Sequence, residues 1–219
     1  MTNPCLRAVP RDSEWIKKHE EYIKKIQNKD CDVVFIGDSI IKYLETSCMW
    51  FDFKNACNCV NLGIGGDRIE NVLWRIQNGE LSFEKQVKAV VLLVGTNNVD
   101  CTVEDIYEGI LELIKEVKKN AENSIIVLPS LLPKGQYPNP YREKNILVNN
   151  LLREKFSEDV EQNEETHNVF FVDVGDSIIE KDGTISDIHL WDYLHLTDVG
   201  YLKTFIHILK KLKKLGIAK

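Results

Sequence analysis

A serine, an aspartate and a histidine stand at positions where the sequence could build a nucleophilic site. Ser39 ends the triplet GDS, directly after the apolar run 32–37, and Asp192 and His195 lie three positions apart near the other end of the chain. A serine hydroxyl attacks effectively only when a base removes its proton, and a carboxylate can hold the imidazole of that base in place. These residue types predict acyl transfer, with Ser39 as nucleophile, His195 as base and Asp192 as its partner.

The GDS triplet on its own supports a second interpretation equally well. Serine is favoured at the residue that caps a helix N-terminus, so Ser39 could have a purely structural role. The segment is not the G-x-S-x-G nucleophile elbow, because its second glycine would stand at position 41, which is Ile41. In a strand-to-helix turn, however, the amide of Ser39 would be a free donor suited to an anion. His189 lies close to His195 in sequence and is the competing candidate for the base.

Two further segments contain candidate donors for an oxyanion. The run NLGIGGD at 61–67 contains Gly66, and glycines let the backbone approach a ligand closely. A dinucleotide-binding G-x-G-x-x-G would require a glycine at position 68, which is Arg68. The run GTNN at 95–98 contains Asn97, whose amide could donate to a developing oxyanion. An ordinary asparagine turn is the alternative, and for GTNN alone the favoured one.

Alternating strand-like and helix-like segments must position these residues. The strand-like runs are 32–37, 59–62, 89–94, 124–128 and 169–174, and the helical patterns are 13–27, 68–76, 103–119, 142–156 and 197–214. Consecutive apolar residues in several runs indicate strands covered on both faces. The sequence therefore predicts an α/β fold with a parallel sheet and helices on both faces. Three of the four candidate segments follow strands, and a proline-rich loop at 129–140 would lie near the same carboxyl edge.

Length and composition indicate one domain over residues 1–219, with residues 1–30 as a helical extension packed on it. The chain has 219 residues, 43% of them hydrophobic, and a formal net charge of −6. That charge argues against nucleic acid or an anionic membrane as a general partner. The lysines of 210–214 are expected on the solvated face of the last helix, and the acidic stretch 157–165 is expected to be a solvated loop or helix end.

Six cysteines and the absence of targeting signals predict a cytoplasmic protein with free thiols. The first residues lack the apolar core of a signal peptide, and no run approaches the length of a membrane span, so no stable membrane insertion is expected. Cys57 and Cys59 have no second Cys or His pair at ligand spacing, so we expect no metal and no cofactor.

The quoted residues resemble the SGNH (GDSL-type) hydrolase superfamily, whose sequence blocks centre on Ser, Gly, Asn and His. FIGDS, NLGIGGDRIENVLWRIQNGEL, LLVGTNN, LLPKGQYPNPYREKN and DYLHLT look closely similar to the catalytic (alpha) subunits of the platelet-activating factor acetylhydrolase type IB subfamily. The resemblance covers about residues 30 to 210. It implies a three-layer α/β/α sandwich with a five-stranded parallel sheet, which is a flavodoxin-like arrangement.

The resemblance also implies roles for particular residues. Ser39, Asp192 and His195 match the catalytic positions, and the N–H groups of Ser39 and Gly66 with the Asn97 side chain match the oxyanion hole. The matching acyl-pocket positions are Ile40, Thr96 and Leu194; Ile stands at position 40 where Met or Leu is usual, which could alter the acyl-length limit.

The implied substrate is the sn-2 acetyl ester of platelet-activating factor or a similar short acyl ester on a lysophospholipid-like backbone. The implied partners are a second copy or a paralogue, and a WD-repeat lissencephaly-type protein. Two alternatives stay open: a mainly non-catalytic dimeric subunit that binds the WD-repeat partner, and an SGNH esterase for another acetylated substrate.

Overall fold

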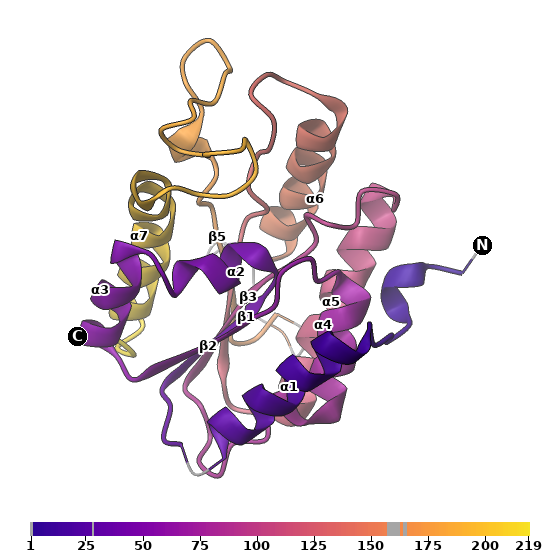
Figure 1. Ribbon diagram of the computed structural model, residues 1–219, viewed down its shortest axis with the longest axis vertical. Helices are drawn as coiled ribbons and strands as arrows, with labels where there is room; N and C mark the ends of the chain where they lie inside the picture. Colours follow the sequence, from indigo (N-terminus) through magenta and orange to yellow (C-terminus); the bar gives the residue numbers. More distant parts are fainter. Residues whose placement is uncertain (1, 28, 157–162, 164–165) are drawn as a thin grey trace.

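Five apolar runs form one parallel sheet in the computed structural model, which describes residues 2–27, 29–156, 163 and 166–219 (Figure 1). The strand order is β2-β1-β3-β4-β5, and every pairing is parallel. The strands are β1 Val33–Gly37, β2 Cys59–Gly63, β3 Ala89–Leu93, β4 Ile125–Pro129 and β5 Val169–Val172. All residues of β1, β2 and β3 are buried, which explains why these runs are apolar at consecutive positions.

Helices cover both faces of the sheet and complete a three-layer α/β/α sandwich, which confirms the expected fold class. Figure 1 shows α3 and α7 on one side and α1, α4, α5 and α6 on the other. The helices are α1 Ser13–Ile26, α2 Ser39–Leu44, α3 Cys48–Ala56, α4 Ile69–Arg75, α5 Val103–Asn120, α6 Pro140–Phe156 and α7 Asp198–Lys214. Short turns of 3-10 helix (Pro4–Leu6, Asp176–Ile178) and of π-helix (Ile76–Glu80) complete the helical elements of the described residues.

The expected strands and long helices are confirmed to within two residues at each end. The sequence patterns missed α2 and α3, which are too short to show a clear apolar period. The expectation that the lysines of 210–214 lie on a solvated face is wrong for one of them. Lys211 is buried, and its Nζ lies 4.0 Å from the Phe170 ring centroid. The acidic stretch 157–165 lies outside the described residues, apart from Asn163.

The chain leaves β1 for β2 on one side and then crosses to β3 on the other, so the carboxyl ends of these three strands meet at a topological switch point. Ligands bind at such points in open α/β sheets. Two glycines allow the tight packing there. A Cβ on Gly63 would lie 2.2 Å from the backbone nitrogen of Lys42, and one on Gly37 would lie 2.0 Å from the carbonyl oxygen of Leu93.

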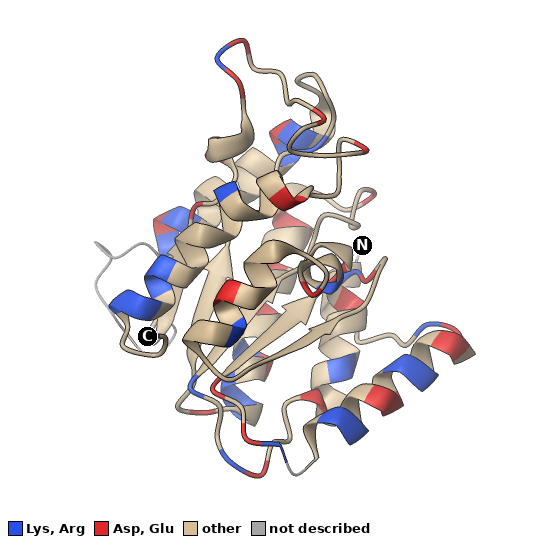
Figure 2. Ribbon diagram, turned by 60° about the vertical axis from the view of Figure 1, so that its left-hand side comes forward, with Lys and Arg blue, Asp and Glu red and all other residues tan. Residues whose placement is uncertain are grey.

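The N-terminal helix α1 is tied to the loop that follows β2. The indole N–H of Trp15 donates to Asp67 Oδ1 at 2.6 Å, and the hydroxyl of Tyr22 donates to the carbonyl of Gly63 at 2.7 Å. Charged residues lie on the outer surfaces of the helices and in loops, while the strands are largely uncharged (Figure 2). All six cysteines are free thiols. Within the described residues, no helix combines the length and apolar character needed to cross a membrane.

Candidate active site

Ser39 is the first residue of α2, two positions after the end of β1, but it is not the helix cap. Asp38 is the cap, and its Oδ1 accepts from the N–H of Ile40 at 2.9 Å. The capping interpretation of Ser39 is therefore wrong, because its neighbour takes that role. Asp38 is fully buried, and its Oδ2 has no hydrogen-bond partner among the described residues. Burial raises the pKa of the Asp38 carboxyl to about 7.

The three candidate catalytic side chains form one hydrogen-bonded chain. His195 Nε2 lies 2.9 Å from Ser39 Oγ, and its Nδ1 lies 2.7 Å from Asp192 Oδ2. With Nδ1–H donating to the carboxylate, Nε2 is free to accept the serine proton. Residues 156 positions apart are thus placed for proton transfer from the hydroxyl to the imidazole.

The turn between Asp192 and His195 is held by the same carboxylate. Asp192 Oδ1 accepts from the backbone N–H of Leu194 at 3.0 Å and of His195 at 2.7 Å. Partial burial opposes ionisation of Asp192, but the hydrogen bonds from the backbone and imidazole of His195 outweigh it and lower the pKa of the carboxyl. Asp192 therefore stays charged, as a partner for the imidazole requires.

The proline-rich segment 129–140 lies at the expected edge and contacts two candidate catalytic loops. The N–H of Gly135 donates to the carbonyl of Tyr193 at 2.7 Å, and Tyr193 has a positive φ of 60° inside the Asp192–His195 turn. Lys134 Nζ donates to the carbonyl of Thr96 at 2.8 Å. Such a positive φ is costly for tyrosine, so the hydrogen bond from Gly135 helps to hold the turn in this conformation.

The three candidate oxyanion donors come from the segments that follow β1, β2 and β3. The amides of Ser39 and Gly66 donate no hydrogen bond to another described residue. Gly66 has a φ of 78°, a conformation that favours glycine, and a Cβ on Gly65 would lie 3.9 Å from the Cβ of Ser39. Asn97 Nδ2 donates to the carbonyl of Asp67 at 2.8 Å, which orients its amide and leaves its second N–H for another acceptor.

Asn98, the other asparagine of GTNN, has a structural role. Its Oδ1 accepts from the N–H of Ile69 at 3.1 Å, and its Nδ2 donates to Glu70 Oε2 at 2.9 Å. The turn interpretation therefore applies to Asn98, whereas Asn97 is oriented beside the loop that contains Gly66.

A buried ion-pair network beneath the site was missed by the sequence patterns. Arg75 is fully buried; its Nε lies 2.9 Å from Asp67 Oδ2, and its Nη1 lies 2.6 Å from Glu80 Oε2. Glu80 in turn lies 2.8 Å from His19 Nδ1. Arg75 also donates to the carbonyl of Gly37 at 3.0 Å, so one guanidinium connects the end of β1 with the loop after β2. The sequence signal that could have revealed this network was the position of Arg75 among the apolar residues of the short helix α4.

Two aromatic rings that contact the imidazole of His195 were also missed. Trp191 stacks on His195 with centroids 5.5 Å apart and an interplanar angle of 18°. Tyr43 meets the same imidazole edge-on at 5.2 Å. Trp191 is 59% exposed, so the stack forms at the surface of the site and limits the positions open to the imidazole.

The positions matched to the acyl pocket differ in exposure. Ile40 and Thr96 are buried, and Leu194 is half-buried. The hydroxyl of Thr96 has no hydrogen-bond partner among the described residues, while the side chain of Ile40 belongs to the hydrophobic core. The assignment of these three residues to an acyl pocket stays a prediction.

His189, the competing base, does not contact Ser39. It is buried, and its Nε2 lies 3.0 Å from Lys203 Nζ and 3.5 Å from Glu180 Oε1. Burial and the nearby lysine lower its pKa. Of the two histidines, His195 is the one that lies beside the serine.

The fold and the site together define a class of protein: an ester hydrolase whose serine follows the first strand of a parallel sheet. Residues 35–203 match the GDSL-like Lipase/Acylhydrolase family. The chain belongs to this family of carboxylic ester hydrolases, which confirms the resemblance found in its sequence.

Within this range of hydrolases, the chain is similar in sequence to particular acetylhydrolase subunits. The chain is 36% identical to platelet-activating factor acetylhydrolase IB subunit alpha1 of Homo sapiens, over 91% of this chain and 85% of that one. It is 35% identical to subunit alpha2 of Rattus norvegicus, over 89% and 82% of the two chains. A solved GDSL-like lipase from Bacteroides thetaiotaomicron superposes with a TM-score of 0.68 at 18% identity, covering 92% and 97% of the two chains, which supports the fold alone.

Proposed function

We propose that the chain is a serine esterase that removes short acyl groups, acetyl above all, from the sn-2 position of platelet-activating factor-like lipids. The observation that carries the proposal is the hydrogen-bonded chain Ser39–His195–Asp192. The similarity to platelet-activating factor acetylhydrolase subunits supports the choice of substrate.

The proposed reaction begins with attack of Ser39 Oγ on the ester carbonyl while His195 Nε2 takes the hydroxyl proton. The N–H groups of Ser39 and Gly66 and the amide of Asn97 would donate to the oxyanion that develops. His195 then gives the proton to the oxygen of the leaving alcohol, so the ester C–O bond breaks and acyl-Ser39 remains. Water activated by His195 releases the carboxylic acid and regenerates the serine.

A series of sn-2 esters that differ only in acyl length tests this function. We expect the highest kcat/KM for acetyl, with a steep fall as the acyl chain lengthens, and no turnover by the Ser39→Ala variant. A preference for long acyl chains, or for acetylated sugars over acetylated lipids, would contradict the proposed substrate but leave the esterase chemistry in place.

We also propose that the chain acts in the cytoplasm as a homodimer or with a paralogue. The relatives are named as subunits, which supports assembly. Binding to a WD-repeat lissencephaly-type protein stays a prediction. Sedimentation of the purified chain tests the pairing: a monomer at micromolar concentration would contradict self-association.

A further inference from the structure

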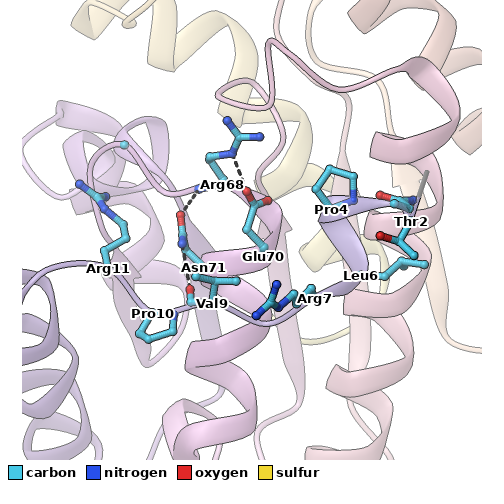
Figure 3. Close-up of a pocket in the computed structure, with 12 residues that line it drawn as sticks. Thr2, Pro4, Leu6, Arg7, Val9, Pro10, Arg11, Arg68, Glu70 and Asn71 are labelled. Atoms are coloured by element: carbon cyan, nitrogen blue, oxygen red, sulfur yellow. Dashed lines mark hydrogen bonds and ion pairs between the residues drawn. The ribbon is translucent and has the colours of Figure 1, made fainter.

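The loop that follows β2 is held from its outer side by an arginine of the N-terminal segment. Arg11 Nη1 donates to the carbonyl of Gly65 at 2.8 Å and lies 3.3 Å from Asp67 Oδ1. One guanidinium thus contacts the residues on both sides of Gly66, whose amide is a proposed oxyanion donor. Figure 3 shows Arg11 extending from the N-terminal segment toward this loop, where it lines a pocket of about 980 Å³.

The peptide bond between Gly65 and Gly66 connects this contact to the site. The bond is planar and trans, so its C=O and N–H groups point in opposite directions. A guanidinium bound to the Gly65 carbonyl therefore fixes the N–H of Gly66 in the direction away from Arg11. A Cβ on Gly65 would lie 3.9 Å from the Cβ of Ser39, so the chain passes beside the proposed nucleophile at this peptide. Among the described residues, none accepts a hydrogen bond from the N–H of Gly66.

The two contacts of Arg11 differ in how much the loop depends on them. Arg11 is the only described residue that donates to the Gly65 carbonyl. Asp67, in contrast, is fully buried and has further partners: its Oδ1 accepts from the Trp15 indole at 2.6 Å, and its Oδ2 lies 2.9 Å from Arg75 Nε. Removal of the guanidinium should therefore leave Asp67 in place and release the Gly65 carbonyl.

The N-terminal segment itself does not need Arg11 as an anchor. The N–H of Val9 donates to the carbonyl of Glu70 at 3.1 Å, and the carbonyl of Val9 accepts from Asn71 Nδ2 at 2.9 Å (Figure 3). These backbone contacts attach the segment to α4 independently of the arginine. A variant of Arg11 should consequently keep the fold and change mainly the orientation of the peptide at Gly65.

We propose that Arg11 is a positioning residue of the esterase: it holds the Gly65 carbonyl so that the N–H of Gly66 faces the developing oxyanion. The proposal rests on the esterase function proposed above. A donor that is oriented before the reaction lowers the barrier, because it does not reorganise as charge develops. The cation on the carbonyl also polarises the peptide, which makes the N–H of Gly66 a stronger donor.

Steady-state kinetics with an acetyl ester test this role. Arg11→Met should lower kcat by about 10- to 100-fold with little change in KM, because a misplaced donor matters only as the oxyanion forms. Arg11→Lys can still donate to the carbonyl and should recover part of the loss. Arg7→Met is the matched control and should keep the wild-type kcat. Arg7 is exposed on the same segment, and its side chain forms no hydrogen bond or ion pair with another described residue.

The ¹⁵N relaxation of the Gly66 amide gives a readout that does not depend on turnover. Its order parameter should be near that of a rigid backbone, about 0.85, in the wild type and in Arg7→Met, and clearly lower in Arg11→Met. An unchanged kcat in Arg11→Met, or the same order parameter in all three proteins, would overturn the proposed role. A wild type that hydrolyses no acetyl ester would contradict the proposed esterase function, and the relaxation data would still decide whether Arg11 orders Gly66.

Discussion

Asn97 and Asp67 connect the loops after β3 and β2 through a 2.8 Å hydrogen bond from the side-chain amide to the backbone carbonyl. The bond fixes the amide of Asn97 near Gly66, so two proposed oxyanion donors are placed relative to each other before substrate binds. Preorganised donors lower the barrier because they need no reorientation as charge develops.

Asn97→Ala should lower kcat by a factor of about 10²–10³, as in known cases where one oxyanion donor is removed. KM should change little, because the bond to the oxyanion strengthens only in the transition state. Steady-state kinetics with an acetyl ester measure both constants. An unchanged kcat in a variant with wild-type thermal stability would exclude Asn97 as a donor.

Asp192→Asn should reduce kcat by about 10⁴-fold, because the amide favours the wrong imidazole tautomer. The hydrogen bonds that Oδ1 accepts from Leu194 and His195 can be kept by the asparagine oxygen, so the turn should remain folded. Asp187→Asn provides the control, since Asp187 is an exposed carboxylate nearby in the sequence. Similar activity in the two variants would contradict the role of Asp192.

The raised pKa of Asp38 predicts that the stability of the fold depends on pH. Its pKa in the folded protein is raised to about 7 from an ordinary value of 3.8, so the folded state holds a proton that the unfolded state releases. This contribution to stability is present below pH 3.8 and is lost as the pH rises through about 7. Urea unfolding should show that Asp38→Asn gains stability relative to the wild type between pH 5 and 8. A constant difference across that range would contradict the raised pKa.

Arg75→Met should destabilise the protein by about 3–5 kcal/mol, because it removes the buried guanidinium that Asp67 and Glu80 share. Arg153→Met is the control: Arg153 pairs with Asp173 at the surface, and such pairs contribute about 0–1 kcal/mol. Urea unfolding of both variants checks the comparison. Equal losses of stability would show that the buried ion pairs of Arg75 contribute no more to the free energy of unfolding than a surface pair does.

The sequence predicted the strands and the three residues of the proposed catalytic chain because these signals are local. Apolar runs identify buried strands, and Ser39 and His195 lie in short segments at element ends. The supporting contacts are non-local. Arg75 and Glu80 are charged, and such residues are expected at the surface unless their partners are known. The stack of Trp191 on His195 depends on the conformation of an irregular turn. Such a turn has no hydrophobic periodicity from which its path could be predicted.

The central claim is that Ser39 becomes acylated, and mass spectrometry of the intact protein tests it most directly. A short incubation with an organophosphate or a slowly hydrolysed acyl ester should add one adduct, and peptide mapping should place it on Ser39. The His195→Ala variant should label far more slowly, because the hydroxyl lacks its base. Labelling at another residue, or a folded wild-type protein that gains no adduct, would contradict the account.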